Sequence, residues 1–298
     1  MRRRKSNMKK SSSLSRKITF SIAFILFVLY SAFILFFFVF AFAIATKTDM
    51  KTFTMDQIEG KLFSFSNPLN FKNFVLAFSE WDDISEYGGY ATMIWNSVWR
   101  TVGYVVISQL STAMVCYILC FYKNKFTKFI YNLGLFLTIL PLYGSAGAQY
   151  KLYSDLGLIN NPMILYADIT LYGGWFFFMY AFWKSIAWEY AEAAFVDGAN
   201  HYMVFFKIML PMFIPGMMAL AVMSFIGTWN GYESTLLYMD QYPNLAYGIY
   251  AYSEISKYKA NTPAYFAGVL IALMPALILF AFFQNSIMEK VYIGGLKG

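Results

Sequence analysis

Long apolar stretches separated by short polar segments dominate the chain. A helix needs about 20 apolar residues to cross a bilayer. Six stretches reach that length, and we predict that they are membrane-spanning helices at residues 18–45, 93–121, 126–146, 164–186, 213–238 and 264–287. The predicted fold is therefore an all-α integral membrane protein with six transmembrane helices.

The first stretch needs comparison with a cleaved signal peptide, because Ala43-Ile44-Ala45 imitates a small-x-small cleavage site. The apolar core of a signal peptide is about 7–15 residues long. The run at 18–45 is far longer, so we interpret it as a retained membrane anchor.

The composition agrees with a membrane protein. The chain is 59% hydrophobic and only 13% charged, whereas ordinary globular chains are about 25% charged. Its net charge of +7 could suggest a nucleic-acid partner, but the excess positive charge is confined to residues 1–17 and the remainder is close to neutral. A basic segment directly before an apolar run is typical of a cytoplasmic flank near anionic lipid. We therefore expect lipid, and no nucleic acid, as the surrounding partner.

Few residues are suited to metal binding or catalysis. Cys116 and Cys120 lie within an apolar run and four positions apart, where we expect them to pack as small hydrophobic side chains. His201 is the only histidine, so we expect no metal cluster, no catalytic Ser–His pair and no catalytic residue. We expect His201 to lie at the surface.

Charge bias predicts the orientation. Lys123, Lys125 and Lys128 lie between the second and third predicted spans with no acid among them, which indicates the cytoplasmic side. Alternation then places the basic tail 1–17, the loop 187–211 and the tail 288–298 in the cytoplasm. The acidic loop 46–92 lies outside, and a permease core of five helices occupies 93–287.

The cytoplasmic loop has the pattern of a helical hairpin. We predict a helix continuing over 187–196, a turn at Asp197-Gly198 where glycine accepts a left-handed backbone, and a second short helix over 200–206. The apolar face of that second helix would consist of Tyr202, Phe205 and Phe206. Pro211 and Pro215 mark the start and a bend of the next span.

This loop resembles the EAA loop of ABC importer permeases. That family has E-A-A, three residues, G, nine residues and I-x-L-P, and all these positions are filled here by Glu192, Ala193, Ala194, Gly198, Ile208, Leu210 and Pro211. The alternative is an ordinary cytoplasmic hairpin in which Glu192 is only solvated. Further resemblance to the maltose-type carbohydrate branch lies in residues 67–74, Asn96-Ser97, Trp229-Asn230 and the glycine-rich tail 294–298.

The resemblance implies partners that the residues alone do not. These are a second permease subunit, two ATPase subunits docked on the EAA loops, and an extracellular solute-binding protein. Docking on this chain would use Glu192 to Ala194, Asp197, Gly198, Tyr202, Phe205, Ile208, Leu210 and Pro211. Gly294, Gly295 and Lys297 of the tail would reach the ATPase. The implied location is a prokaryotic cytoplasmic membrane.

The chain has no glycine-rich phosphate loop followed by lysine and a hydroxyl residue. ATP and magnesium would therefore be bound by the partner ATPases, and this chain is expected to be a translocation subunit rather than an enzyme.

Polar residues near membrane spans are candidates for a sugar pathway. Trp229, Asn230, Tyr232 and Glu233 combine aromatic faces with amide and carboxylate groups that suit sugar hydroxyls. An interfacial aromatic belt is the alternative for Trp229. Arg100 has a simpler explanation in snorkelling toward the headgroups, with a pathway role as the alternative.

Three other functions are alternatives to a sugar importer permease. A permease for a non-sugar solute would share the loop but lack the carbohydrate-branch features. A secondary transporter would show repeats or mid-membrane acids, and an integral membrane enzyme would need clustered ionisable residues. Neither pattern is evident in the sequence, which favours a sugar importer permease that works by alternating access.

Overall fold

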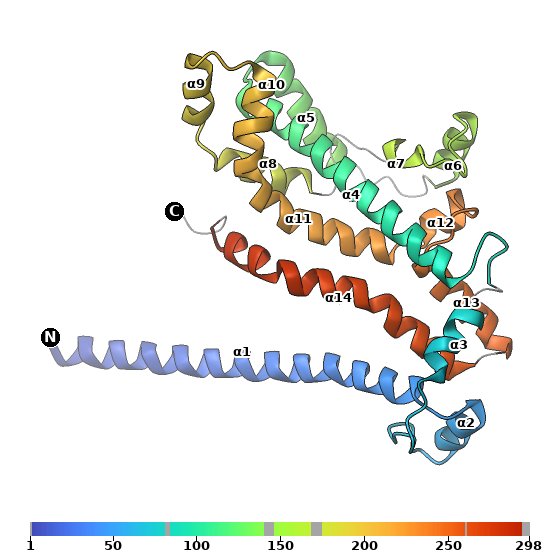
Figure 1. Ribbon diagram of the computed structural model, residues 1–298. Coiled ribbons are helices and arrows are strands. Elements are labelled where there is room, and N and C mark those ends of the chain that lie inside the picture. Colours follow the sequence, from blue (N-terminus) through green and yellow to red (C-terminus); the bar gives the residue numbers. More distant parts are fainter. Residues whose placement is uncertain (1, 81–83, 140–145, 168–174, 260, 294–298) are drawn as a thin grey trace. The chain divides into compact units, whose positions relative to one another are not determined.

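A computed structural model describes residues 2–80, 84–139, 146–167, 175–259 and 261–293. Over these residues the chain is helical and contains no strand, which confirms the all-α fold class. The elements are α1 (Arg2–Ala45), α2 (Met50–Ile58), α3 (Lys72–Glu80), α4 (Tyr90–Phe121), α5 (Lys125–Ile139), α6 (Ala146–Asp155), α7 (Ile164–Ala167), α8 (Phe176–Lys184), α9 (Glu189–Val196), α10 (His201–Met203), the π-helix η1 (Val204–Met209), α11 (Leu210–Asn230), α12 (Glu233–Tyr238), α13 (Leu245–Lys259) and α14 (Thr262–Ile293) (Figure 1).

The chain forms two compact units. Unit 1 contains Met1–Ala77 and Ser256–Leu270, and unit 2 contains Phe78–Ile255 and Ile271–Gly298. The candidate coupling loop and the candidate pathway residues all belong to unit 2.

In unit 1, the segment after α1 is folded against the end of that helix. Lys47 is fully buried, and its ammonium group donates hydrogen bonds to the Asp56 carboxylate and, over 2.5 Å, to the Ser64 carbonyl. Asn73 Nδ2 donates to the carbonyls of Ala45 and Lys47 at 2.8 and 2.7 Å. The segment that the sequence presented only as an acidic loop, 46–92, therefore contains α2, α3 and an ion pair between buried Lys47 and partly exposed Asp56.

The core of unit 2 lies where α4 packs against α8 and α11 (Figure 1). Trp183 of α8 and Phe213 of α11 are both buried and stack with ring centroids 4.1 Å apart. Cys116 and Cys120 of α4 are buried, unbridged members of the same cluster. Their predicted role as small hydrophobic side chains is confirmed.

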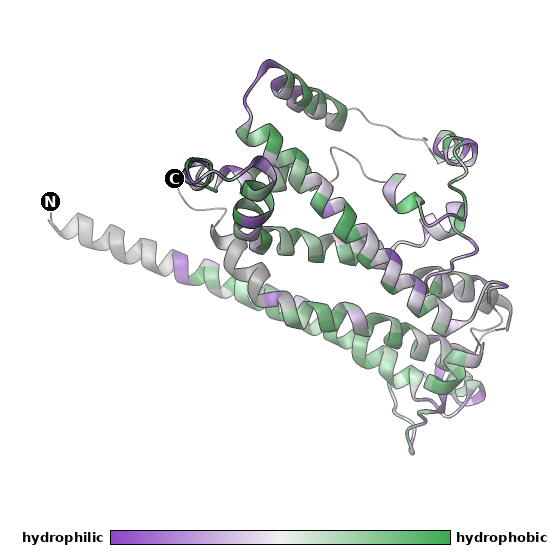
Figure 2. Cartoon of the chain, turned by 45° about the horizontal axis from the view of Figure 1, so that its top comes forward, coloured by the Kyte–Doolittle hydropathy of each residue, from purple (hydrophilic) through white to green (hydrophobic). Residues whose placement is uncertain are grey.

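Four described helices are long and apolar enough to cross a membrane. They are Arg16–Ala45, Tyr90–Phe121, His201–Asn230 and Thr262–Phe282, and Figure 2 shows apolar residues predominating along the first of them. These correspond to the first, second, fifth and sixth predicted spans. The third and fourth, 126–146 and 164–186, coincide with α5 and with α7 and α8, but their residues 140–145 and 168–174 lie outside the described residues.

The fifth span differs from the prediction of 213–238 at both ends. The helix is already established at His201 and it stops at Asn230, because Gly231 takes an extended conformation with φ −77° and ψ 117°. The chain then turns into the separate short helix α12. Hydropathy did not reveal this break because α12 carries apolar residues such as Leu236 and Leu237.

Candidate functional site

The candidate coupling loop, 187–211, is built on a tight turn between α9 and α10. Gly198 has φ +84°, a left-handed conformation that favours glycine, and a Cβ atom added there would meet nothing within 4 Å. The Ala199 N–H bonds the Ala194 carbonyl and the Gly198 N–H bonds the Phe195 carbonyl, each over 3.0 Å. This pair of bonds is the Schellman motif that ends many helices. The predicted turn at Asp197-Gly198 is confirmed.

The helix after the turn begins with a side-chain cap. Asn200 has an extended backbone, and its Oδ1 accepts a hydrogen bond from the Met203 N–H at 2.8 Å. Such a cap satisfies one of the free N–H groups at a helix start and is typically worth about 1 kcal/mol. The sequence therefore specifies both sides of the turn locally.

The prediction of a separate short helix over 200–206 is wrong. α10 continues through the π-helix η1 directly into α11. Pro211 has no N–H group, so it cannot make the usual bond to the carbonyl four residues earlier. The helix passes this position with a wider turn, in which the Leu210 N–H bonds the Phe205 carbonyl five residues back. A π-helical segment of this kind is rare and is frequent at functional sites.

The motif residues divide between an outward and an inward face. Glu192, Ala193, Asp197, Gly198 and Pro211 are exposed, and so is Tyr202 at 79%. Ala194, Phe205 and Leu210 are buried in the unit 2 core, and Ile208 packs against that core. Of the expected apolar face, Tyr202 and Phe206 are exposed, whereas Phe205 is buried and contacts Tyr117 of α4 with ring centroids 4.9 Å apart.

His201 ties the loop to the end of α4. It is exposed, as expected, and its Nδ1 shares a hydrogen bond of 2.6 Å with the Tyr122 hydroxyl. Its ring also meets Phe195 of α9 edge to face, with centroids 4.9 Å apart. α9, α10 and the α4 terminus are thus held at one end of unit 2 (Figure 1).

The four pathway candidates at and after the end of α11 do not form one cluster of polar groups available to a sugar. Trp229 is buried, its Nε1 donates to the Ala272 carbonyl at 3.1 Å, and its ring stacks on Phe225. Tyr232 stacks on Tyr250 with centroids 4.5 Å apart. Asn230 and Glu233 are exposed. The alternative of an interfacial belt for Trp229 is not what the structure shows, because its ring is packed inside unit 2.

Arg100 is not a snorkelling residue. It is only 6% exposed, and its guanidinium donates to Thr235 Oγ1 at 2.6 Å, to the Tyr242 carbonyl at 2.8 Å and to Ser234 Oγ at 3.0 Å. These partners all belong to the segment after α11. A buried arginine that meets several acceptors acts as a clamp between distant parts of the chain.

Two neighbours of Arg100 complete this clamp. Asn96 Nδ2 donates to the Pro243 carbonyl at 3.0 Å, and Ser97 Oγ accepts from the Leu245 N–H at 2.8 Å. Sequence reasoning noticed Asn96-Ser97 only through family resemblance. Their positions one turn before Arg100 on a single helix face were a signal that could have linked the three residues.

The remaining tail candidates, Gly294, Gly295 and Lys297, lie outside the described residues. Within the residues that the structure describes, no group of three or more His, Cys, Asp and Glu side chains is placed to hold a metal ion.

Comparisons with known proteins place these features in a family. The chain is 31% identical over 232 residues to an arabinooligosaccharides transport system permease protein, AraQ, of Halalkalibacterium halodurans, covering 77% of this chain and 80% of that protein. It is also 31% identical over 244 residues to a diacetylchitobiose uptake system permease protein, NgcG, of Streptomyces coelicolor, covering 79% and 77%. No protein-family profile matches the chain.

A solved structure shares the fold. It is a chain of a bacterial ABC transporter involved in the import of the acidic polysaccharide alginate, with a TM-score of 0.72, 18% identity, and coverage of 91% of this chain and 97% of that one. The identities to the permease proteins, taken over more than two thirds of both partners, show the family. The chain belongs to the carbohydrate branch of the ABC importer permeases, the membrane subunits of sugar transport systems.

Proposed function

We propose that this permease pairs with a second permease to carry a sugar or oligosaccharide across a prokaryotic cytoplasmic membrane, driven by two ATPase subunits that bind ATP and magnesium. A solute-binding protein would deliver the sugar from outside. The observation that carries this proposal is the EAA loop, whose motif residues form a capped, two-faced hairpin at one end of unit 2.

The outward face of the hairpin is the surface offered to an ATPase. Glu192, Ala193, Val196 and Tyr202 are exposed, with Val196 at 88%. An exposed valine beside small and acidic residues suits insertion into a groove of a partner. Glu192 adds an acceptor for a charged hydrogen bond.

The inward face transmits the motion. Ala194, Val204, Phe205 and Met209 are buried against α4, α8 and α11. The Schellman turn, the Asn200 cap and the His201–Tyr122 hydrogen bond leave little freedom within the loop. Because close-packed interiors transmit displacement, a force on the outward face is passed to the membrane helices.

The helix that leaves the loop extends this connection across the membrane. His201 to Asn230 is one continuous helix, roughly 45 Å long at about 1.5 Å per residue. Near its far end Trp229 hydrogen-bonds the α14 backbone. Tilting of this helix would therefore move α14 as well, which is the physical basis we propose for alternating access.

The orientation follows from the same assignment. The loop 187–211, the lysines after α4 and both termini would lie in the cytoplasm, with 46–92 outside. Asn230 and Glu233 remain candidates for contacts with sugar hydroxyls because both are exposed. Trp229 is a weaker candidate, since its N–H group already has a partner.

Charge reversal on α9 tests the coupling. In the assembled importer reconstituted in liposomes, Glu192→Arg should abolish sugar-stimulated ATP hydrolysis and uptake while membrane insertion is retained. Glu189→Arg is the matched control, because Glu189 is an exposed acid on the same helix outside the motif. Normal uptake by Glu192→Arg would refute the proposal.

The same preparation tests the substrate class. The candidate solute-binding protein, loaded with different oligosaccharides, should stimulate ATP hydrolysis. Stimulation only by a peptide or phosphate compound would leave the coupling role intact and reject the sugar.

A further inference from the structure

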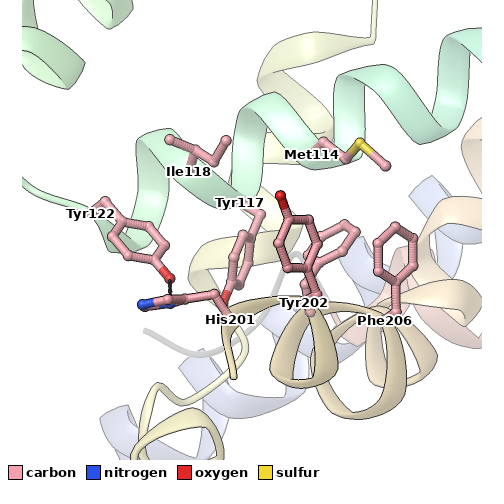
Figure 3. Close-up of a pocket in the computed structure, with 8 residues that line it drawn as sticks. Met114, Tyr117, Ile118, Tyr122, His201, Tyr202 and Phe206 are labelled. Carbon is pink, nitrogen blue, oxygen red and sulfur yellow. Dashed lines mark hydrogen bonds between the residues drawn. The ribbon is translucent and has the colours of Figure 1, made fainter. Parts of the chain in front are cut away.

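A pocket of about 430 Å³ lies between the cytoplasmic-loop end of α4 and the helix formed by α10 and η1 (Figure 3). This volume is within the range of pockets that take small ligands, about 300–1,000 Å³. Its wall from α4 consists of Met114, Tyr117, Ile118 and Tyr122, and its opposite wall consists of His201, Tyr202, Phe205 and Phe206. The lining is almost wholly apolar and aromatic, with polar groups only on the tyrosines and the histidine.

One polar atom in the wall lacks a partner. The Tyr117 side chain is only 4% exposed, and among the described residues its hydroxyl makes no hydrogen bond of good geometry, although the Tyr122 hydroxyl lies close to it. Buried hydroxyl groups are nearly always hydrogen-bonded, because an unmade bond there is unfavourable. In Figure 3 the Tyr117 ring projects from α4 toward His201, across the space between the two walls. A polar atom of a ligand in the pocket could supply the missing bond.

The pocket lies at the end of an exposed apolar stripe along α4. Its members are large side chains that wind around the helix from one end to the other, namely Trp95, Val98, Val102, Val106, Met114 and Ile118. From Trp95 to Ile118 the stripe is roughly 35 Å long at about 1.5 Å per residue, which matches the ~30 Å hydrocarbon core of a bilayer. Helix–helix interfaces in membranes favour small residues instead, so these residues have the composition of a lipid-facing surface.

Positive charge follows the stripe. Lys123, Lys125 and Lys128 come directly after α4, and Lys207 lies on η1 beside Phe206; all four are exposed. The sequence from Phe121 to Ile139 contains no acid. Lysines at a cytoplasmic membrane surface attract anionic lipid headgroups.

We propose that the pocket binds an anionic phospholipid of the cytoplasmic leaflet. One acyl chain would fill the space between Ile118 and Phe206, the ester region would hydrogen-bond the Tyr117 hydroxyl, and the headgroup would contact Lys123 and Lys125. The leaflet rests on the orientation proposed above. The lipid would touch α4 and the coupling loop together, so its presence would stiffen their junction.

A photoreactive lipid tests the site. The purified permease is placed in nanodiscs of phosphatidylcholine with a trace of phosphatidylglycerol that carries a diazirine at the end of one acyl chain. After illumination and digestion, mass spectrometry should find the label on peptides containing Met114–Ile118 and Tyr202–Phe206. Added phosphatidylglycerol should displace it, and added phosphatidylcholine should not. A nanodisc presents the same lipids at both faces, so the result does not depend on orientation, transport or the identity of the sugar.

Five variants sharpen the result. Ile118→Trp fills the pocket and should abolish labelling there, whereas Val106→Trp makes the same change on the stripe outside the pocket and should not. Tyr117→Phe removes the unpartnered hydroxyl, so it should weaken lipid retention with no loss of thermal stability. Lys123→Gln and Lys125→Gln should each weaken the preference for phosphatidylglycerol about fivefold.

The alternatives give distinct results that overturn the proposal. Equal labelling of the pocket and of Val98–Val106, or equal displacement by both lipids, would indicate unspecific surrounding lipid. Loss of labelling once the second permease and the ATPases are assembled would show that a protein partner occupies the pocket.

Discussion

Replacing Arg100 by methionine should loosen the segment after α11, because this guanidinium holds the segment at three points. Its bonds reach Ser234, Thr235 and Tyr242. Methionine has a similar length and suits an apolar environment, so the variant removes the bonds without leaving a large cavity.

The magnitude follows from those bonds. A hydrogen bond from a charged donor contributes about 1.5–3 kcal/mol. The net loss of stability is smaller than the sum of the three bonds. Burying the guanidinium is itself costly, and the hydroxyl groups of Ser234 and Thr235 can rotate toward other acceptors once it is gone. The Tyr242 carbonyl cannot rotate independently, so we expect a net loss of roughly 2–3 kcal/mol in the local opening free energy, about one such bond.

Hydrogen exchange measures this loss directly. A change of that size should speed exchange of the backbone amides of Leu236, Met239 and Tyr242, which donate within the segment, by roughly 30- to 150-fold. Val98→Met introduces the same residue on an exposed position of the same helix and is the control. If exchange across the segment is as slow in Arg100→Met as in Val98→Met, the clamp is not what holds it.

Further changes separate local from tertiary effects. Gly198→Ala should lower the thermal midpoint through a left-handed cost of about 1 kcal/mol, whereas Gly227→Ala, on an ordinary helical backbone with equal space, should not. The hydrogen bond from Lys47 lowers the pKa of Asp56, so the stabilisation of the segment from Lys47 to Ser64 is present above the ordinary aspartate pKa and is lost as the pH falls through the lowered value. Amide hydrogen exchange in that segment, normalised to the intrinsic exchange rate at each pH, should therefore rise only in acid, and Asp56→Asn should remove the pH dependence. Trp229→Phe loses one hydrogen bond and about 1 kcal/mol of stability but should leave the KM of sugar uptake unchanged; a raised KM would return Trp229 to the sugar pathway.

The local chemistry of the coupling loop was predictable from the sequence. Gly198 favours a left-handed turn, and Asn200 is a strong helix cap wherever it precedes a helix. Both act within five residues of themselves, so no knowledge of the rest of the chain was needed. The long apolar runs at 18–45 and 264–287 are equally direct, because span length depends only on bilayer thickness.

The continuation of the loop helix into α11 needed the structure. Pro211 predicts a helix boundary when taken alone, since proline usually occupies a first turn. The backbone instead stays helical through this position, because Val204, Phe205 and Met209 pack against the core. The wider hydrogen bonding of η1 accommodates the N–H group that Pro211 lacks. Propensity was overridden by burial.

Which residues face a partner and which face the core was decided by tertiary structure as well. Ala193 and Ala194 are identical in sequence terms, yet one is exposed and the other is buried. Likewise Arg100 hydrogen-bonds Thr235, which is 135 positions away in the sequence. The pattern of hydrophobic residues along a single helix cannot predict such a contact. The sequence by itself determined that this chain is a helical membrane protein with a helical hairpin at its EAA loop, because those features arise from hydropathy and short-range backbone geometry. Only the folded chain decided where Arg100, Trp229 and Phe205 direct their side chains, because that depends on what distant segments bring within hydrogen-bonding and packing distance.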